Sequence, residues 1–230
     1  MLEKENIFEE LNPLFESPTI KPSFKKVHVI LALYIFEENE DGIGRYRLQK
    51  ELEIGSGTAK SLIKKLNRDI NFITVLTDKN IRKGHILTKI GLDFVQKVKQ
   101  KIQLIDKGDP LVLKEIIIKP EGNFSYLSYV RDVADKISNG IDQRDAAIKI
   151  GGVGATCLLY DGKDLIFPSQ ITSQNEKEQV KVEDDVFMYI STHLNSKHLN
   201  LKENDVIIIG LGETTEKARL AALNASLTLL

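Results

Sequence analysis

The chain has 230 residues, of which 42% are hydrophobic and 28% are charged, and its formal net charge is −1. This is the composition of an ordinary soluble protein, and its apolar runs are too short to span a bilayer, so we expect no membrane association. One cysteine, Cys157, excludes an intramolecular disulfide, and the acidic start Met1–Glu5 is unlike a signal peptide. We therefore expect a cytoplasmic protein, and the length favours two domains.

Charge is unevenly distributed along the chain. Residues 21–102 contain seventeen Lys or Arg against nine Asp or Glu, a formal charge of +8, whereas residues 1–20 carry −4 and residues 103–230 carry −5. A basic module in an otherwise acidic chain suggests a polyanion-binding surface, because phosphate neutralisation supplies most non-specific nucleic-acid affinity. A solvated face with a chance excess of lysine is the alternative.

The first predicted elements are helical. Residues 1–20 have apolar side chains at nearly helical spacing and predict an amphipathic helix, whose apolar side either covers the domain or meets a second subunit. The apolar run Val27–Phe36 is too long for an ordinary strand and predicts a buried helix with Ser23 as its N-cap. Residues 45–47 predict a short strand, and a second helix follows over residues 48–52.

A tight turn, a third helix and a hairpin come next. Residues 55–57 predict a turn in which glycine tolerates positive φ, and over residues 58–67 apolar side chains recur at helical spacing. Residues 72–76 and 85–88 predict the strands of a β-hairpin with a polar, basic tip. Thr88 is the expected cap of a last helix, which carries apolar residues on one face and lysines on the other.

The predicted elements follow the order of a winged helix-turn-helix domain, which is helix, short strand, helix, tight turn, helix and basic hairpin. The stretches GRYRLQKELEIGSGTAKSLIKKL and KGHILTKIGLDFVQKV closely resemble winged-helix regulators of archaea and bacteria, and the resemblance covers about residues 23–102. It implies a recognition helix in the major groove of double-stranded DNA and a basic wing on phosphates or the minor groove. Protein docking is the alternative use of such a domain. The expected DNA-facing residues are Ser56, Thr58, Lys60, Ser61, Lys64 and Lys65 on the helix, with Lys79, Arg82 and Lys83 on the wing.

Residues 103–110 end a helical pattern in turn-forming residues and predict a linker after the module of residues 21–102. The following domain, residues 111–230, contains Asp161-Gly162, which suits a type I′ hairpin turn. Its order β-α-β-β-α-β-α predicts a two-layer α+β domain with a largely antiparallel sheet, for which a ferredoxin-like arrangement is a candidate. The predicted strands are residues 111–118, 155–160, 164–167 and 205–210, and the predicted helical regions are residues 128–150, interrupted at 139–140, then 182–194 and 214–229.

Two glycine clusters in this domain are the candidate ligand site. One joins a helix to a strand, and the other joins a strand to the terminal helix, where free amides and the helix dipole can hold a small anionic metabolite. An arginine can add a bidentate contact to such an anion. The alternative is that these glycines serve only caps and tight turns. The candidate ligand-binding residues are Arg144, Gly151, Gly152, Gly154, Gly210, Gly212 and Thr214.

Signals for catalysis are missing from the sequence. The four histidines have no recognised zinc spacing, and Cys157 lies in an apolar strand, which is typical of a buried structural thiol. The paired carboxylates Asp142 and Asp145 have no accompanying base, nucleophile or metal cluster. We therefore expect no enzyme activity, no cofactor and no metal.

Two further stretches, GIDQRDAAIKIGGVGATCLLYDGKDLIFP and DVIIIGLGETTEKARLAALNASLTLL, resemble an archaeal family of winged-helix proteins whose C-terminal domain has no established function. The first hypothesis is a DNA-binding transcriptional regulator, whose C-terminal domain dimerises, senses a small ligand, or does both. A homodimer would use residues 1–20 or the Ala-rich terminal helix as its interface. The alternatives are an enzyme or enzyme remnant acting on a phosphorylated metabolite, and a protein-interaction module.

Overall fold

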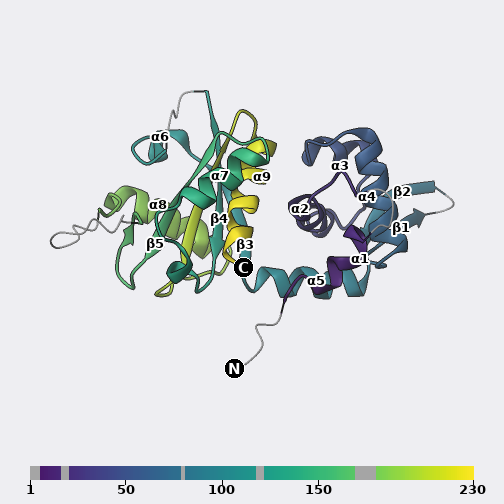
Figure 1. Ribbon diagram of the computed structural model, residues 1–230, viewed down its shortest axis with the longest axis horizontal. Coiled ribbons are helices and arrows are strands. Elements are labelled where there is room, and N and C mark those ends of the chain that lie inside the picture. Colours follow the sequence, from purple (N-terminus) through teal and green to yellow (C-terminus); the bar gives the residue numbers. More distant parts are fainter. Residues whose placement is uncertain (1–5, 17–20, 79–80, 118–121, 169–179) are drawn as a thin grey trace. The chain divides into compact units, whose positions relative to one another are not determined.

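The computed structural model describes residues 6–16, 21–78, 81–117, 122–168 and 180–230, and for residues 78 and 81–83 it describes the backbone alone. The chain divides into two compact units, Met1–Lys99 and Gln100–Leu230 (Figure 1). Among the described residues, no helix is both long enough and apolar enough to cross a membrane.

The N-terminal unit has the predicted order of three helices, a hairpin and a final helix. Its hairpin is antiparallel and joins Ile73 to Leu87 and Asp78 to Ile81. The elements are η1 (Glu9–Leu11), α1 (Asn12–Phe15), α2 (Lys26–Glu37), α3 (Arg45–Glu51), α4 (Ser56–Arg68), β1 (Ile73–Asp78), β2 (Ile81–Leu87) and α5 (Lys89–Lys99).

Three local predictions in this unit are wrong. Residues 45–47 begin α3 instead of forming a strand, and the strand-like contact is a bridge between Ile43 and His85. The turn before α4 takes its positive φ at Glu53, whereas Gly55 has φ −67 and serves as the helix N-cap. Ser23 does not cap α2, since that N-cap is Lys25, whose backbone N–H donates to His28 Nδ1 at 2.9 Å.

The N-terminal segment packs inside its own unit. Phe8, Leu11 and Leu14 are at most 6% exposed, so the apolar side predicted for residues 1–20 is covered over the described residues 6–16. The Lys65 ammonium fixes the segment by donating to the Leu14 carbonyl at 2.8 Å. Of the two uses predicted for this segment, the structure shows the intramolecular one.

The C-terminal unit is an α+β domain whose five-stranded sheet is antiparallel at every described pairing, in the order β3-β4-β7-β5-β6. The chain turns between β5 and β6 at Asp161-Gly162 as predicted. The turn is not of the expected type I′, because that type needs a positive φ at both central residues and only Gly162, with φ +99, has one. The elements are β3 (Ile102–Gly108), α6 (Pro110–Leu113), β4 (Phe124–Val130), η2 (Ala134–Lys136), α7 (Ile141–Lys149), β5 (Gly154–Tyr160), β6 (Leu165–Ile166), α8 (Asp184–Ser196), β7 (Val206–Gly212), α9 (Thr215–Ser226) and η3 (Leu227–Leu229).

Several boundaries differ from the prediction. The expected linker at residues 103–110 is most of β3, and the expected strand at 111–118 begins instead with α6, because Asp109 accepts the Leu111 N–H and Pro110 starts the helix. The expected helical region from residue 128 begins inside β4. The ferredoxin-like arrangement does not hold, since its split β-α-β unit would separate the first two strands, whereas β3 and β4 are hydrogen-bonded neighbours.

Helices cover both faces of the sheet, so the unit has three layers where two were predicted (Figure 1). All seven residues of β7 are buried. Ile207, Ile209 and Leu211 belong to the hydrophobic cluster that includes Val186 and Ile190 of α8. The alternate residues of β7, which include Gly210 and Gly212, face α9.

Glycines let α9 approach β7 at backbone distance. A Cβ on Gly210 would lie 2.1 Å from the Ala222 nitrogen and 2.6 Å from the Ala218 carbonyl oxygen. One on Gly212 would lie 2.4 Å from the Ala218 nitrogen. Separations this short are well inside van der Waals contact, so a side chain at either position would push the helix off the sheet.

We expect Gly210→Ala to destabilise the C-terminal unit by about 3 kcal/mol, because both clashing neighbours are backbone and the helix must shift. Chemical denaturation followed by circular dichroism measures the change. Gly44→Ala is the control, because nothing lies within 4 Å of the added Cβ. Equal stability of the two variants would contradict the close packing.

His28 makes the N-terminal unit sensitive to mild acid. It is 7% exposed, and burial, followed by the nearby Lys25 charge, lowers the pKa of its imidazole from 6.5 to about 4. The unfolded chain therefore binds this proton at higher pH than the folded chain does, so the stability contribution is complete above about pH 6.5 and is lost as pH falls towards 4. We expect the melting temperature of wild type to fall more between pH 7 and pH 4.5 than that of His28→Gln, which keeps an acceptor and does not titrate. Parallel falls would refute this role.

Candidate nucleic-acid interface and ligand site

Helix α4 has one buried and one exposed stripe. Ala59, Leu62 and Leu66 are fully buried in the N-terminal core. On the opposite side the exposed residues recur at intervals of four, which keeps them on one face of the helix. That face consists of Ser56, Lys60, Lys64 and Arg68.

Three of the predicted DNA-facing residues are placed differently. Lys65 is half-buried and engaged with the Leu14 carbonyl, and its ammonium also lies 3.6 Å from the Asp69 carboxylate. Thr58 shares a hydrogen bond with the Ser23 hydroxyl at 2.8 Å, and Ser61 is half-buried. The structure therefore gives Lys65 and Thr58 partners within their own unit.

The predicted wing is an antiparallel hairpin, held close to the chain before α3. A Cβ on Gly84, which has φ +127, would lie 2.6 Å from the Ile43 backbone, so the hairpin and that segment touch. Arg82 and Lys83 lie in β2, with Arg82 opposite Thr77. Their side chains and the whole of Lys79 lie outside the described residues.

Helix α3 adds a basic, aromatic surface that sequence reasoning missed. Tyr46 is 75% exposed, with the Arg45 guanidinium 4.9 Å from its ring centre, and Arg47 pairs with Glu51 at 3.5 Å. Assigning residues 45–47 to a strand hid this face. The sequence did contain a signal for this face, because four of the six residues Arg45–Lys50 are basic or aromatic and they surround the apolar Leu48.

The second glycine cluster is a packing feature, not an open loop. Gly210 and Gly212 lie against α9, as described above. Thr214 caps α9 by accepting the Lys217 N–H at 3.1 Å. Glu213 pairs with the Lys217 ammonium at 2.7 Å, and this contact lowers the pKa of the Glu213 carboxyl. A carboxylate and a side-chain cap thus already occupy the helix start that was expected to hold an anion.

The first glycine cluster divides between three roles. A Cβ on Gly152 would lie 2.6 Å from the Ala221 Cβ, so this glycine also serves close packing. Gly151 has φ +96 and follows the C-cap of α7. Gly154 begins β5 near Arg144, whose Cγ would be 3.8 Å from an added Cβ. Of the predicted ligand residues, Arg144 therefore has Gly154 beside it, whereas Gly152, Gly210 and Gly212 lie against α9.

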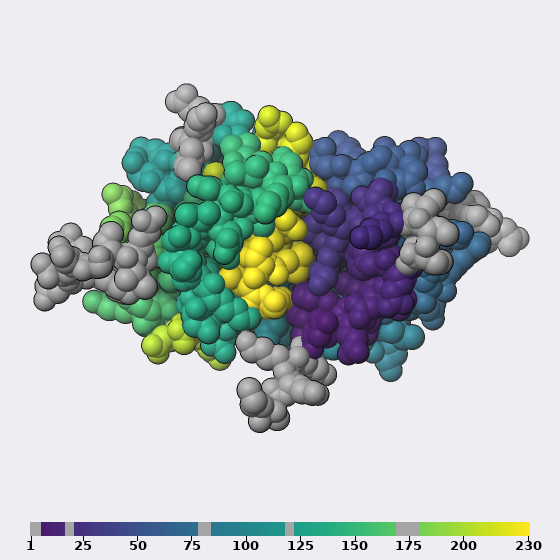
Figure 2. Space-filling model, in the orientation of Figure 1, coloured from purple at the N-terminus to yellow at the C-terminus, as the bar shows by residue number. Residues whose placement is uncertain are grey.

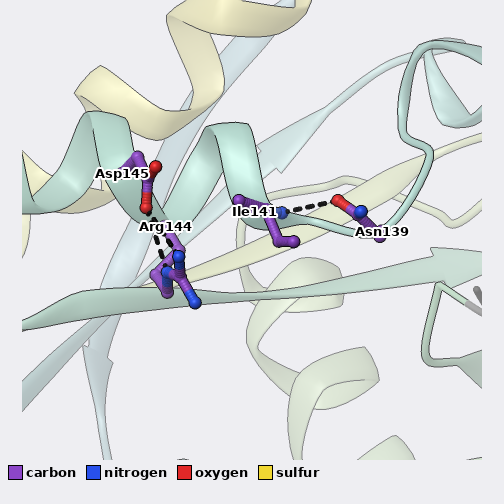
Figure 3. A network of polar contacts seen from close by, with 4 residues as sticks. All are labelled: Asn139, Ile141, Arg144 and Asp145. Carbon is purple, nitrogen blue, oxygen red and sulfur yellow. Dashed lines mark hydrogen bonds and ion pairs between the residues drawn. The ribbon is translucent and has the colours of Figure 1, made fainter.

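A cavity of about 210 Å³ lies beside Arg144. Its walls come from Asn139-Gly140-Ile141 at the start of α7, from Ala155–Cys157 of β5 and from Phe167-Pro168 after β6. Figure 3 shows Arg144 and Asp145 side by side on α7, with Asn139 accepting the Ile141 N–H at 3.0 Å. Figure 2 shows α7, in green, at the surface with part of α9, in yellow, visible beside it.

One wall of this cavity carries a buried thiol. Cys157 is 4% exposed, and burial raises the pKa of its thiol to about 12, so the thiol is protonated at neutral pH and is a poor nucleophile. Within the described ranges, no three histidine, cysteine or acidic side chains are grouped as a metal site.

Comparison with known proteins finds a family match inside the C-terminal unit and a solved structure of similar fold. Residues 121–229 match a family described as a domain of unknown function, DUF4443. The chain is also similar to a solved structure, the hypothetical protein PH0730 from Pyrococcus horikoshii OT3, with 20% identity and a TM-score of 0.58 over 90% of this chain and 93% of that one. No curated protein matches the chain. At this identity the likeness shows the fold alone.

We expect Lys65→Ala to loosen residues 6–16 by about 1 kcal/mol, because the Leu14 carbonyl loses a charged donor. Amide hydrogen exchange over Phe8–Phe15 should quicken by several-fold. The neighbouring Lys64→Ala should leave exchange in this segment unchanged, since Lys64 lies on the exposed stripe. If both variants behave alike, Lys65 does not anchor the segment.

Proposed function

We propose that the N-terminal unit is a winged helix-turn-helix domain that binds double-stranded DNA, and that the protein is a transcriptional regulator rather than an enzyme. The observation that carries this proposal is the exposed stripe Ser56–Lys60–Lys64–Arg68 on α4. It sits on a helix that follows α3 after a short turn and precedes the β1–β2 hairpin, which is the order such readers use.

The charge and placement of this surface favour DNA over a protein partner. The stripe combines three cations with one small polar residue, Ser56, and α3 adds Arg45, Arg47 and the exposed Tyr46. Arginine, lysine and tyrosine side chains commonly contact phosphate oxygens, which fix the register of a protein on a duplex. A basic surface spread over two helices suits the repeated charge of a phosphate backbone, whereas protein–protein interfaces are depleted of lysine relative to the rest of the surface.

The proposal includes a homodimer, because a helix-turn-helix reader gains affinity from two half-sites about one helical turn apart. Over the residues that the structure describes, neither interface predicted from the sequence has an unoccupied apolar face. Residues 6–16 cover their own core, and the alanines of α9 lie against Gly210, Gly212 and Gly152. Contact between subunits would therefore use other surfaces of the chain.

We expect Lys60→Ala with Lys64→Ala to weaken binding to unrelated duplexes alike and to flatten its salt dependence by about 2 in the log–log slope, since each phosphate contact contributes about 0.9. Fluorescence anisotropy between 50 and 200 mM salt measures both effects. The charge-matched control is Lys163→Ala with Lys202→Ala, both exposed in the C-terminal unit, which should retain the wild-type slope.

Two results would overturn the proposal. Wild-type protein that shows no salt-sensitive binding to duplex DNA at 50 mM salt would remove it and favour protein docking. Equal loss in the control variant would show that net charge, not the α4 surface, governs binding.

A further inference from the structure

Helix α7 has a buried side and an exposed side. Gln143, Ala146 and Ala147 are buried, and the helix packs on β5 and α9. The exposed side carries two isoleucines, Ile141 at 38% exposure and Ile148 at 50%. A spacing of seven residues returns to the same side of a helix after two turns, so these two side chains form a short apolar line along the outer surface of α7.

Two opposite charges flank this apolar line. Each residue turns the helix by about 100°, which places Arg144 about 50° to one side of the line and Asp145 about 50° to the other. Because they are neighbours in the sequence, they lie at nearly the same level along the axis, midway between Ile141 and Ile148. Arg144 Nε and Nη2 both donate to Asp145 Oδ1, at 3.1 and 2.9 Å (Figure 3). These two side chains are 48% and 44% exposed, so both remain accessible to a partner.

The charges on α7 limit the kind of partner that fits it. The charged residues of this helix, two acidic and two basic, are Asp142, Arg144, Asp145 and Lys149. Their charges cancel, so the helix has no net attraction for a polyanion or for a strongly basic surface. Charges beside an apolar seam set the choice of partner and its orientation when two helices pack together. A complementary partner therefore has an apolar line of its own, with its two flanking charges in the opposite lateral order.

A second copy of this chain has that order in one orientation. Rotation about a two-fold axis parallel to α7 exchanges the two flanks and keeps the level along the helix, so Arg144 of each copy meets Asp145 of the other. A two-fold axis perpendicular to α7 would make the helices antiparallel and would set Arg144 against Arg144. The charges therefore select the parallel arrangement.

We propose that α7 is a contact between two copies of this chain, in which the two α7 helices pack in parallel. Ile141 and Ile148 each meet the same residue of the second copy, and two Arg144–Asp145 pairs form between the copies. A guanidinium has five N–H donors, so Arg144 can bind its own carboxylate and that of the second copy together. The inference rests on the homodimer of the proposed function and gives it an interface.

The size of the contact fits a weak dimer. The nine residues of α7 span only about 13 Å. A contact made mainly by one helix of this length is well below the roughly 1,600 Å² that stable complexes bury. Two half-sites on one duplex would bring the subunits together and raise their effective concentration. The dimer is therefore expected at high protein concentration without DNA and at lower concentration on DNA.

Cysteine cross-linking of the full chain without DNA tests the parallel contact. In Ile148→Cys the two introduced thiols meet at the two-fold axis, so mild oxidation should give a disulfide-linked dimer on non-reducing electrophoresis. The control is Ser196→Cys, exposed at the end of α8, which should cross-link at least tenfold more slowly. Native Cys157 is 4% exposed and should not contribute. Equal rates in the two variants would overturn the parallel contact.

Charge exchange tests the pairs between the copies, with sedimentation at high protein concentration and low salt as the measurement. Arg144→Asp should weaken association about tenfold, because it sets two carboxylates against each other, and Asp145→Arg should do the same with two cations. The double exchange R144D with D145R restores opposite charges on the flanks and should return association to within about twofold of wild type. A monomeric wild type, or a double variant as weak as the single ones, would overturn the proposal.

Neither measurement uses DNA. A failure here would therefore leave the α4 surface as the proposed DNA reader, and a wild type that dimerises through α7 without binding duplex DNA would remove the DNA proposal alone.

Discussion

The contact between α9 and β7 is the constraint on which the C-terminal unit depends. It needs positions without side chains at Gly210 and Gly212 on the strand, and at Gly152 on the loop that carries α7 into β5. Because backbone meets backbone there, α9 lies close enough to β4 for its Ser226 hydroxyl to reach Ser128 at 2.8 Å. Helix α7 packs beside α9, and Asn224 donates to the Ala146 carbonyl at 2.7 Å. The glycines thus fix both helices of this layer.

The same contact explains why the glycine clusters mislead when only the sequence is known. A glycine-rich stretch between a strand and a helix is compatible with an anion loop and with close packing, and only the position of a distant helix separates the two. The alanines of the terminal helix mark it in the sequence as a candidate interface, but spacing alone does not identify glycines of a distant strand as their partners. A role for Arg144 in ligand binding stays a prediction.

Elements with a strong hydrophobic periodicity could be predicted from the sequence. Elements with a weak periodicity depend on pairing with distant parts of the chain. The buried stripe of α4, the hairpin turn at Asp161-Gly162 and the buried run of β7 are local signals, and they were placed nearly correctly. The end of strand β4 was assigned to a helix because Leu127–Val130 is a run of buried residues without alternation, and its strand conformation depends on pairing with β3 and β7 on either side. The cavity could not have been foreseen, since it depends on Pro168 lying opposite Cys157 across a hairpin.

Two neighbouring lysines on α4 have different roles. Lys64 and Lys65 are adjacent in the sequence but about 100° apart around the axis, so one lies in solvent and the other reaches the Leu14 carbonyl. The net charge of a segment does not show which of its lysines is exposed and which contacts the protein itself. One lysine of the pair can therefore stabilise the fold while the other remains available to a binding partner.

Pro168 also bears on how the sheet avoids self-association. Unpaired strand edges are templates for addition of further strands from other molecules, and proteins block them with proline, bulges and charge. At one border β6 has only two residues and is followed by Pro168; at the other, β3 is bulged between Leu104 and Lys107 and exposes Asp106 and Lys107. A short strand followed by proline at one border and a bulged, charged strand at the other make the sheet a poor template for added strands.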